Sequence, residues 1–560
     1  VGFGANFFWY INVSQGGILT LLNDIHVGNL GDGSLVLQSN STASTAGNAV
    51  IGSESTGVGE VEIDNSSWSI AGDLEVGKHG EGSLLLFGLG GGQVDSANGV
   101  IGAEAGGSGQ VDLTSSSSWL NSGTLVVGGA GEGTLSVRGN SVVEVDSGNG
   151  TVMLAEEAGS VGNLNLGNSF GSGAEGIVNA AAIMGGNGTA TVSFLQRELI
   201  TFTPKITGSA SVRQNVQFAP LGGTRLTGLN DYTGSTTITG GQLIVADGGE
   251  IQFTSSILVN GIENPALVVD GSNHAGVFTP GLLEIGRDES GTLTIKNGGQ
   301  LTNGEAVIGG KASGFGTIGL RGGDTLWSTL GTLTLGGEGF ADLTLTGGTV
   351  EFDAIEVSNS STVNWNFGTF RDTSDLTVDA DLLQSLIGFG SGQGGTPELD
   401  TGKTLDADGT ATLNTQLIVN GGTFEAGDVE NAFLMDLRQG TFNLTQADLD
   451  VANGGLLGKT LEVVSGVEIN VTNNVTVGSD GELAMNGGIF TGGTLANDGV
   501  ISGDGEVGGP VTNNAGGEIR AGQNDDLRLT GTLDNAGWVE VIGTPEGPAE
   551  LEIDGAATNQ

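Results

Sequence analysis

The chain has 560 residues, among them 107 Gly, only 8 Pro and no Cys. Its 64 acidic and 16 basic side chains give a formal net charge of −48, which excludes a nucleic-acid partner because such partners require clustered Lys and Arg. The lack of Cys excludes disulfides and thiolate metal sites. No apolar run reaches the roughly 18 to 20 residues that membrane insertion needs, so no membrane-inserted segment is expected.

The first 194 residues repeat a unit of about 25 residues. Each unit closes a short strand with an apolar residue followed by Gly, and a Gly-rich turn then leads into the next strand. A fixed period of this size is typical of solenoids, in which each unit buries its apolar face against its neighbours. The predicted fold is therefore all-β, a parallel β-helix (β-solenoid) with one rung per unit. The closing positions are Gly28, Gly52, Gly77, Gly102, Gly128, Ala155 and Gly185.

Alternate units differ in the length of the turn. From each closing position to the first apolar residue of the next strand, the counts are 7, 9, 7, 9, 7, 9 and 7. Trp68 and Trp119 both fall in nine-residue units, and Phe170 has the comparable place in the third. A second array begins at Gly286 with counts of 7, 9 and 7, and Trp327 lies in its nine-residue unit. The rungs are thus predicted to pair into a two-rung repeat.

Changes in this rhythm predict five segments. They are residues 1–194, a first β-solenoid array; 195–280, an irregular insertion; 281–370, a second array; 371–410, a linker with a short helix; and 411–560, a C-terminal β-solenoid section. The boundaries follow the places where the spacing of closing positions is lost or regained.

Three local predictions refine this division. Residues 194–214 are expected to form an inserted hairpin or a capping loop. A short helix is predicted over Asp379 to Ile387, with an Asp at the N-cap and Gly388 after its end. Asn or Thr side chains at equivalent turns of the solenoid are expected to stack in ladders. Near the end of the chain, Asn recurs beside Gly in successive turns, which indicates the same turn chemistry in each rung. These are Asn497, Asn514 and Asn535.

Short motifs in the two arrays carry a resemblance. They are NSSW at Asn65–Trp68, SSSSW ending at Trp119 and GEGTL at Gly131–Leu135. Through them, residues 28–194 and 286–367 resemble the repeats of type V secretion (autotransporter) passengers and of PEP-CTERM surface proteins.

A further stretch, LTGLNDYTGSTTITGGQLIV within residues 225–249, is similar to the autotransporter-associated β-strand repeat. Together the resemblances imply a secreted, right-handed β-helix displayed at or beyond a bacterial cell surface. They imply no particular activity, because such repeats are scaffolds shared by adhesins, fibres and other proteins.

Few residues point to catalysis. His26, His79 and His274 stand far apart in the sequence, and no nucleophile motif such as G-x-S-x-G accompanies them. The acidic cluster at Asp375, Asp379 and Asp381 lies at a helix start, where Asp serves in capping. No catalytic residue is therefore predicted, and the protein is not expected to be an enzyme.

One segment bears on metal binding. Asp406-Ala-Asp408-Gly409 resembles the beginning of a calcium loop, but the third ligand and the closing Glu are missing. We predict no cofactor and no dedicated metal site, with calcium bound at most adventitiously to surface carboxylates.

Aromatic side chains concentrate in the first ten residues of a chain that is only 5% aromatic. The open ends of a β-helix need protection against strand pairing. These aromatics are expected either to cap the first rung or to seat against the far end of another subunit in a head-to-tail filament. The predicted contact residues are Phe3, Phe7, Phe8, Trp9 and Tyr10.

Three functional hypotheses follow. The first is a non-enzymatic extracellular structural protein that self-associates into a surface fibre, sheath or matrix. The second is an adhesin that binds a glycan or a cell-surface protein through its irregular regions, residues 195–280 and 371–411. The third is a polysaccharide lyase or hydrolase that uses grouped carboxylates.

Overall fold

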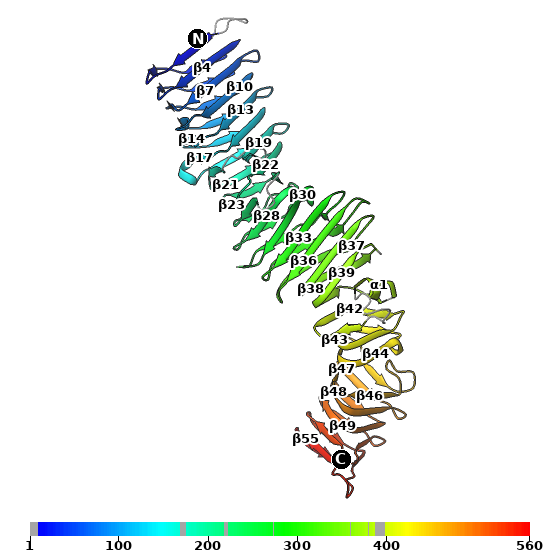
Figure 1. The fold of residues 1–560 in the computed structure, drawn as a ribbon. Helices are drawn as coiled ribbons and strands as arrows, with labels where there is room; N and C mark the ends of the chain where they lie inside the picture. The colour runs from blue at the N-terminus through cyan, green and yellow to red at the C-terminus, as the bar shows by residue number, and fades with distance from the viewer. Residues whose placement is uncertain are drawn as a thin grey trace. The chain divides into compact units, whose positions relative to one another are not determined.

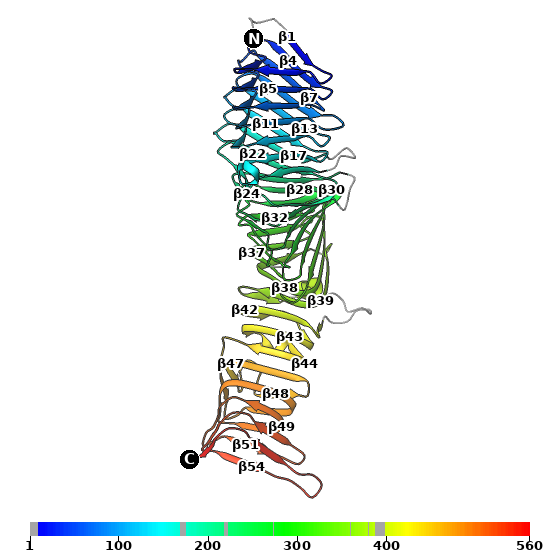
Figure 2. The same cartoon turned by 90° about the vertical axis from the view of Figure 1, so that its left-hand side faces the viewer.

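The computed structural model describes residues 9–168, 175–217, 222–272, 274–358, 360–378, 380–386 and 398–560. It is a β-solenoid of about 22 turns with parallel stacked strands, 63% strand and 2% helix, which confirms the predicted fold class. The chain divides into two compact units, residues 1–318 with 336–341 and residues 319–335 with 342–560. Figures 1 and 2 show the stacked strands of each unit in two views.

Three parallel ladders build the first array, and each complete turn contributes one strand to each ladder. The first ladder contains β1 (Trp9–Val13), β4 (Asp32–Gln38), β7 (Val58–Asp64), β10 (Glu81–Phe87), β13 (Ser108–Leu113), β16 (Glu132–Val137), β19 (Val161–Gly167) and β22 (Thr189–Leu195). The second contains β2 (Ile18–Leu21), β5 (Thr42–Thr45), β8 (Ser67–Ile70), β11 (Gln93–Ser96), β14 (Ser118–Asn121), β17 (Ser141–Val145) and β20 (Gly176–Asn179). The third contains β3 (Ile25–Val27), β6 (Ala49–Ile51), β9 (Leu74–Val76), β12 (Gly99–Ile101), β15 (Leu125–Val127), β18 (Thr151–Leu154), β21 (Ala182–Gly185) and β24 (Lys205–Gly208).

Alternate residues of these strands point into a continuous apolar core. In the first ladder, Leu35, Val61, Leu84 and Val111 pair in register, and each is at most 1% exposed. Successive side chains of a strand point to opposite faces, so every second residue joins this core. Each rung therefore buries its apolar face against the rungs before and after it.

Gly is required for two reasons at closing positions such as Gly77. At Gly77 the backbone is left-handed, with φ of 69°, a conformation that L-residues with a side chain rarely adopt. A Cβ at Gly77 would also lie 2.1 Å from the carbonyl oxygen of Ser108 in the next rung. Ala155 keeps the left-handed backbone at φ 52°, in the unit where the spacing to the next closing position lengthens to 30 residues.

The nine-residue units contain an additional β-turn. Val61 follows a nine-residue turn, yet it pairs in register with Leu35 and Leu84, which follow seven-residue turns. The two extra residues therefore leave the ladder unchanged, and the predicted two-rung repeat is confirmed. The hydrogen bonds that close the additional turns run from Gly57 N–H to Glu54 O at 2.7 Å, Gly107 N–H to Glu104 O at 2.9 Å and Ser160 N–H to Glu157 O at 3.1 Å.

Large and small side chains alternate in the second ladder. Trp68 and Trp119 are buried, and each indole Nε1 donates at 3.0 Å to a hydroxyl of the preceding rung. A close-packed core accepts an indole in one rung only where the adjacent rungs carry smaller side chains. Trp327 is also buried, whereas Phe170 lies outside the described residues. The in-register column reads Ala43, Trp68, Val94, Trp119 and Val143.

The described strands of residues 195–280 pair in parallel with their neighbours, in the segment where an irregular insertion was expected. β23 (Leu199–Phe202) pairs in parallel with β26 (Gly223–Leu226), and β25 (Ser211–Asn215) pairs in parallel with β22. These described strands do not form the predicted hairpin. The single strand β28 (Thr236–Ala246) then pairs with both β25 and β26. The sequence rhythm breaks because one long strand replaces a strand–turn–strand unit.

Buried polar side chains explain the residue pattern of 225–249. Tyr232 is fully buried, and its hydroxyl lies 2.7 Å from Thr236 Oγ1, which lies 3.0 Å from Thr254 Oγ1. Asn230 accepts from a backbone N–H of the preceding rung and donates to a backbone carbonyl of the next. The Asn, Tyr and Thr side chains of this segment thus link successive rungs through hydrogen bonds.

In the second unit, longer strands stack in parallel around an aromatic core. Phe370, Leu405, Phe424 and Phe442 pair in register, and the rings of Phe424 and Phe442 stack with centroids 5.7 Å apart. The strands include β37 (Leu326–Leu335), β38 (Phe340–Val357), β39 (Thr362–Asp372), β40 (Leu376–Val378), β41 (Glu398–Asp400), β42 (Lys403–Leu413), β43 (Leu417–Glu430), β44 (Met435–Leu444), β45 (Leu449–Val451), β46 (Thr460–Val464), β47 (Val467–Val477), β48 (Glu482–Asn497) and β49 (Val500–Gly508).

The predicted short helix is present as α1 (Ala380–Leu386). Its expected N-cap, Asp379, and the following Gly388 lie outside the described residues. Residues 403–410 belong to β42, so the predicted linker is shorter than its expected range of 371–410. The alternating side chains of these residues explain this difference, since Leu405 and Ala407 point into the core.

Replacing Gly77 with Ala is expected to lower the free energy of unfolding by about 2 to 4 kcal/mol, because the added Cβ meets a backbone carbonyl that cannot rotate away. Gly106→Ala is the matched control, since Gly106 has φ of 85° but open space around its Cβ position. The control should cost only the left-handed backbone penalty of about 1 kcal/mol. Urea denaturation followed by circular dichroism measures both, and equal losses would show that the close approach is unimportant.

Candidate functional site

The structure describes two of the five predicted contact residues. Trp9 and Tyr10 begin β1, where Trp9 pairs with Gly33 of β4. Trp9 is partly buried, and its Nε1 lies 3.0 Å from the position that a Cβ on Gly33 would take. Tyr10 points outward and is 53% exposed. The subunit contact stays a prediction, and its other members, Phe3, Phe7 and Phe8, lie outside the described residues.

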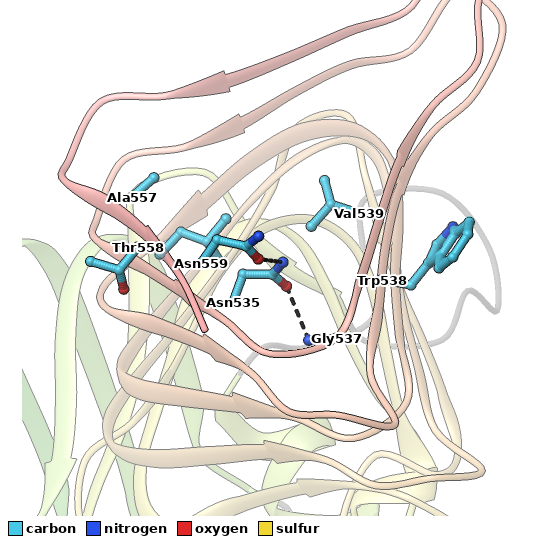
Figure 3. Close-up of a pocket in the computed structure, with 8 residues that line it drawn as sticks. Asn535, Gly537, Trp538, Val539, Ala557, Thr558 and Asn559 are labelled. Atoms are coloured by element: carbon cyan, nitrogen blue, oxygen red, sulfur yellow. Dashed lines mark hydrogen bonds between the residues drawn. The ribbon is translucent and has the colours of Figure 1, made fainter.

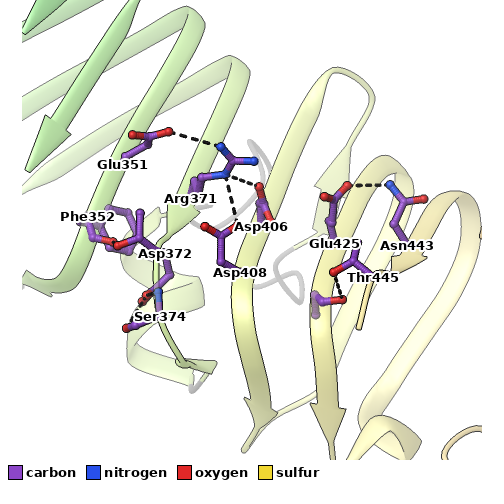
Figure 4. A network of polar contacts seen from close by, with 12 residues as sticks. Glu351, Phe352, Arg371, Asp372, Ser374, Asp406, Asp408, Glu425, Asn443 and Thr445 are labelled. Carbon is purple, nitrogen blue, oxygen red and sulfur yellow. Dashed lines mark hydrogen bonds and ion pairs between the residues drawn. The ribbon is translucent and has the colours of Figure 1, made fainter. Parts of the chain in front are cut away.

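Polar side chains form a column on an outer face of the second unit (Figure 4). Parallel pairing places in-register residues of adjacent rungs about 4.8 Å apart. Each side chain of this polar column therefore meets those of the rungs before and after it. Its members, in order, are Glu351, Arg371, Asp406, Glu425, Asn443 and Asn470.

Arg371 neutralises carboxylates from two neighbouring strands. Its Nε lies 2.6 Å from Asp406 Oδ2 and 3.7 Å from Asp408 Oδ1, and its Nη1 lies 3.3 Å from Glu351 Oε1. Burial raises the pKa of Asp406, an effect that Arg371 partly offsets. The hydrogen bond to Asp406 in turn raises the pKa of the guanidinium of Arg371. The segment that resembles a calcium loop thus meets a cationic side chain of the protein itself.

The rest of the polar column is bonded from rung to rung. Asn443 Nδ2 donates to Glu425 Oε2 at 2.8 Å. Asn470 Nδ2 donates to Asn443 Oδ1 at 3.1 Å and to Glu468 Oε1 at 2.9 Å. The carboxylates of the column are therefore held by neighbouring side chains, an arrangement that stabilises the stacking of rungs.

One acid beside the polar column points into the core instead. Asp372 is 3% exposed and pairs in register with Phe352 of the preceding rung. Its Oδ1 accepts hydrogen bonds of 2.9 Å from both the backbone N–H and the hydroxyl of Ser374. Burial raises the pKa of Asp372 to about 6, and the nearby charges of Asp353 and Asp375 act in the same direction.

Sequence reasoning missed Asp372 and grouped other acids instead. Asp375 Oδ1 accepts a hydrogen bond from the backbone N–H of Thr410 at 2.8 Å, a structural role. Asp379 lies outside the described residues, and the side chain of Asp381 is likewise not described. The alternation of apolar and polar residues along β39 could have shown that Asp372 shares a face with Phe370.

Asparagine side chains form a second ladder, as predicted. Asn497 Nδ2 donates to Asn513 Oδ1 at 2.8 Å, Asn513 to Asn535 at 2.7 Å, and Asn535 to Asn559 at 2.9 Å. Asn513, at the end of its strand, is in register with Asn535, whereas Asn514 accepts a hydrogen bond from Gly517 N–H in the following turn. The ladder joins the ends of β48, β50 (Val511–Asn513), β53 (Leu533–Asn535) and β56 (Ala557–Asn559).

The last members of the asparagine ladder line a hollow of about 440 Å³ (Figure 3). It is also lined by Trp538 and Val539 of β54 (Trp538–Val541), which are 65% and 37% exposed. In the preceding turn, the residue paired with Val539 is Ile519 of β51 (Glu518–Ala521), and it is fully buried. Val539 thus occupies an inward position and is partly exposed, whereas Trp538 is in register with Glu518 and points away from Val539 (Figure 3).

Between residues that the structure describes, ion pairs involve at least twelve basic side chains. Many join adjacent rungs, such as Arg138 with Asp112 and Lys296 with Asp270. Because 64 acidic side chains face 16 basic ones, the surface stays strongly negative after this pairing. The paired bases are Lys78, Arg138, Lys205, Arg225, Arg287, Lys296, Lys311, Arg371, Lys403, Arg438, Arg520 and Arg528.

The remaining candidates do not converge on one site. His26 Nδ1 lies 2.6 Å from Ser53 Oγ, and the backbone N–H of His274 donates to Gly271 O within a turn. In the part of the chain that the structure describes, no group of three or more His, Asp or Glu is placed to hold a metal ion. No helix among the described residues has the length and apolar character to cross a membrane.

Comparison of the sequence with protein-family models and with curated proteins finds no match. The resemblance to autotransporter and PEP-CTERM repeats therefore stays a prediction from short motifs. The function has to be argued from the geometry of the described faces.

Replacing Asp372 with Asn is expected to remove a pH-dependent loss of stability. The ordinary pKa of an Asp is about 4, and in the fold it is about 6, so the folded state binds the proton more tightly. The contribution of Asp372 to the free energy of unfolding of the wild type therefore falls as the pH rises from about 4 to 6. Asn keeps the acceptor for Ser374 and carries no charge. The stability of Asp372→Asn relative to wild type should rise by on the order of 2 kcal/mol across this window.

Urea denaturation at a series of pH values measures this difference. Asp480→Asn, at an exposed position in the second unit, is the control for the loss of one surface carboxylate. A flat curve for Asp372→Asn would contradict the assignment of a buried, proton-binding carboxyl.

Proposed function

We propose that the chain is a non-enzymatic extracellular structural protein, a β-solenoid that forms or decorates a fibre, sheath or matrix at a bacterial cell surface. The observation that carries this proposal is the bonding of polar side chains from rung to rung, in the polar column and in the asparagine ladder. These groups bond to their in-register neighbours and do not converge on a common point. A surface built in this way keeps its shape without a ligand.

Head-to-tail association of subunits is part of the proposal. Within the described residues, β1 pairs only with β4, and β54 pairs only with β51. Each offers a backbone edge beside exposed apolar or aromatic side chains, Tyr10 on β1 and Trp538 on β54. A strand of another subunit would complete the hydrogen bonding of such an edge. A contact between unlike edges does not close on itself and extends into a filament.

A surface adhesin is the second candidate function. It is favoured by a groove on the first unit, described in the next subsection, which lies partly within residues 195–280. Solenoids usually carry binding sites where loops or bulges interrupt the regular stack.

The structural role predicts ordered, concentration-dependent assembly of the purified chain. Sedimentation velocity and negative-stain electron microscopy across a concentration series should show filaments, and assembly should strengthen as salt screens the acidic surfaces. The double variant Trp9→Ser/Tyr10→Ser should raise the concentration needed for assembly about tenfold or more, because it removes aromatic surface from the predicted contact. A tenfold rise corresponds to a loss of about 1.4 kcal/mol of association free energy.

Phe433→Ser is the matched control, since Phe433 is an aromatic residue that is 79% exposed elsewhere on the surface. It should assemble like the wild type. A chain that stays monomeric at every concentration and salt level would refute the filament, and equal effects of both variants would refute the contact at Trp9 and Tyr10.

A further inference from the structure

A bulge interrupts the regular stacking of the first unit. In the pairing of β30 (Ile257–Asp270) with β33 (Ser290–Lys296), Gly261 lies opposite Ser290 and Ala266 lies opposite Thr292. Residues 262–265 therefore bulge out of the pairing with β33, whereas Glu263 still pairs with Gly240 of β28. Ile262, on this bulge, is 78% exposed.

A groove of about 630 Å³ lies beside this bulge. Its lining comes from successive rungs, because it includes the end of β25, the middle of β28, the bulge of β30 and the turn before β33. The volume is within the range of roughly 300 to 1,000 Å³ that is usual for small-ligand sites. The residues that matter for recognition are Asn215, Gln217, Thr239, Leu258, Ile262 and Arg287.

A buried asparagine holds the groove in shape. Asn260 is only 9% exposed, and its Oδ1 accepts from the backbone N–H groups of Asp288 at 3.0 Å and Glu289 at 2.9 Å. Its Nδ2 donates to Asp288 Oδ1 at 2.6 Å, which helps to keep the pKa of Asp288 low. Ser290 Oγ donates to Gly261 O at 2.7 Å. The turn and the bulge are thus fixed to each other, so the groove is formed before any ligand binds.

The functional groups of the groove suit a neutral, hydroxyl-rich ligand. The amides of Asn215 and Gln217 and the hydroxyl of Thr239 can each donate and accept. The guanidinium of Arg287 adds charged donors to the lining, and its Nη1 lies 3.5 Å from Glu284 Oε2. Leu258 and Ile262 supply an apolar surface beside these polar groups.

The carboxylates of the groove disfavour negatively charged ligands. The groove also contains Glu263, Asp288 and Glu289, and the whole chain carries a formal charge of −48, so an anionic polysaccharide is repelled. Asp288 is bonded to Asn260, and its nearest cation is Lys311 at 3.7 Å. Alternating hydroxyl and C–H surfaces of a sugar match adjacent polar and aliphatic side chains. We propose that this groove binds a neutral oligosaccharide, a function that goes beyond the structural role and does not depend on filament formation.

Titration calorimetry of the full chain tests this site with five defined probes. Three are neutral (cellohexaose, maltohexaose and mannohexaose), one is anionic (hexagalacturonate), and one is cationic (octalysine). At least one neutral hexasaccharide should bind saturably. The double variant Ile262→Ser/Arg287→Gln should weaken that binding at least about tenfold, a loss of roughly 1.4 kcal/mol. Gln217→Ala should weaken it by a smaller factor.

Leu89→Ser is the matched control, because Leu89 is a fully exposed apolar residue on a turn of the same unit and lines a different hollow. It should bind like the wild type, and the thermal midpoint of every variant should match that of the wild type. The proposal is overturned if no neutral hexasaccharide binds, if the double variant binds as well as the wild type, or if octalysine competes more strongly at this groove. Filament formation by the double variant should be unchanged, so failure of this proposal and failure of the structural role are distinguishable.

Discussion

In-register parallel pairing is the constraint on which the structure depends. It places each residue about 4.8 Å from its counterpart in the next rung. Every side chain therefore has to fit beside the in-register side chains of the rung before and the rung after. Inside, this demands volumes that fit together, and the column containing Trp68 and Trp119 meets the demand by alternating indoles with Ala or Val. The two-rung repeat is the consequence of this packing, since an indole in every rung would overfill the core.

The same constraint acts on charge at the surface. Identical carboxylates in adjacent rungs would repel one another at short range. The polar column reduces this repulsion by placing Arg371 between Glu351 and Asp406 and by pairing Glu425 with Asn443, although Asp406 and Glu425 stay adjacent in register. A chain with four times as many acids as bases cannot do so everywhere. Its net repulsion favours solubility and a dependence on salt, whereas cohesion comes from the core and the backbone ladders.

The bulge in β30 is one of several register shifts along the stack, and it lies beside a groove lined by polar groups. The polar column and the asparagine ladder satisfy their own groups along the stack. At the bulge of residues 262–265 the ladder is interrupted, and polar groups of several rungs face a shared space. The proposed scaffold role and the proposed binding role therefore rest on different residues, so each can be tested separately.

The sequence by itself determined the fold class, the two-rung repeat, the short helix and the existence of an asparagine ladder, because period and turn length are local properties. Only the tertiary structure decided that Asn513 rather than Asn514 joins the ladder and that Asp372 points inward. It also brought Arg371 to Asp406, which is 35 residues away. A shift of one residue reverses the face on which a side chain lies, and such shifts arise from pairing between strands that are distant in the chain.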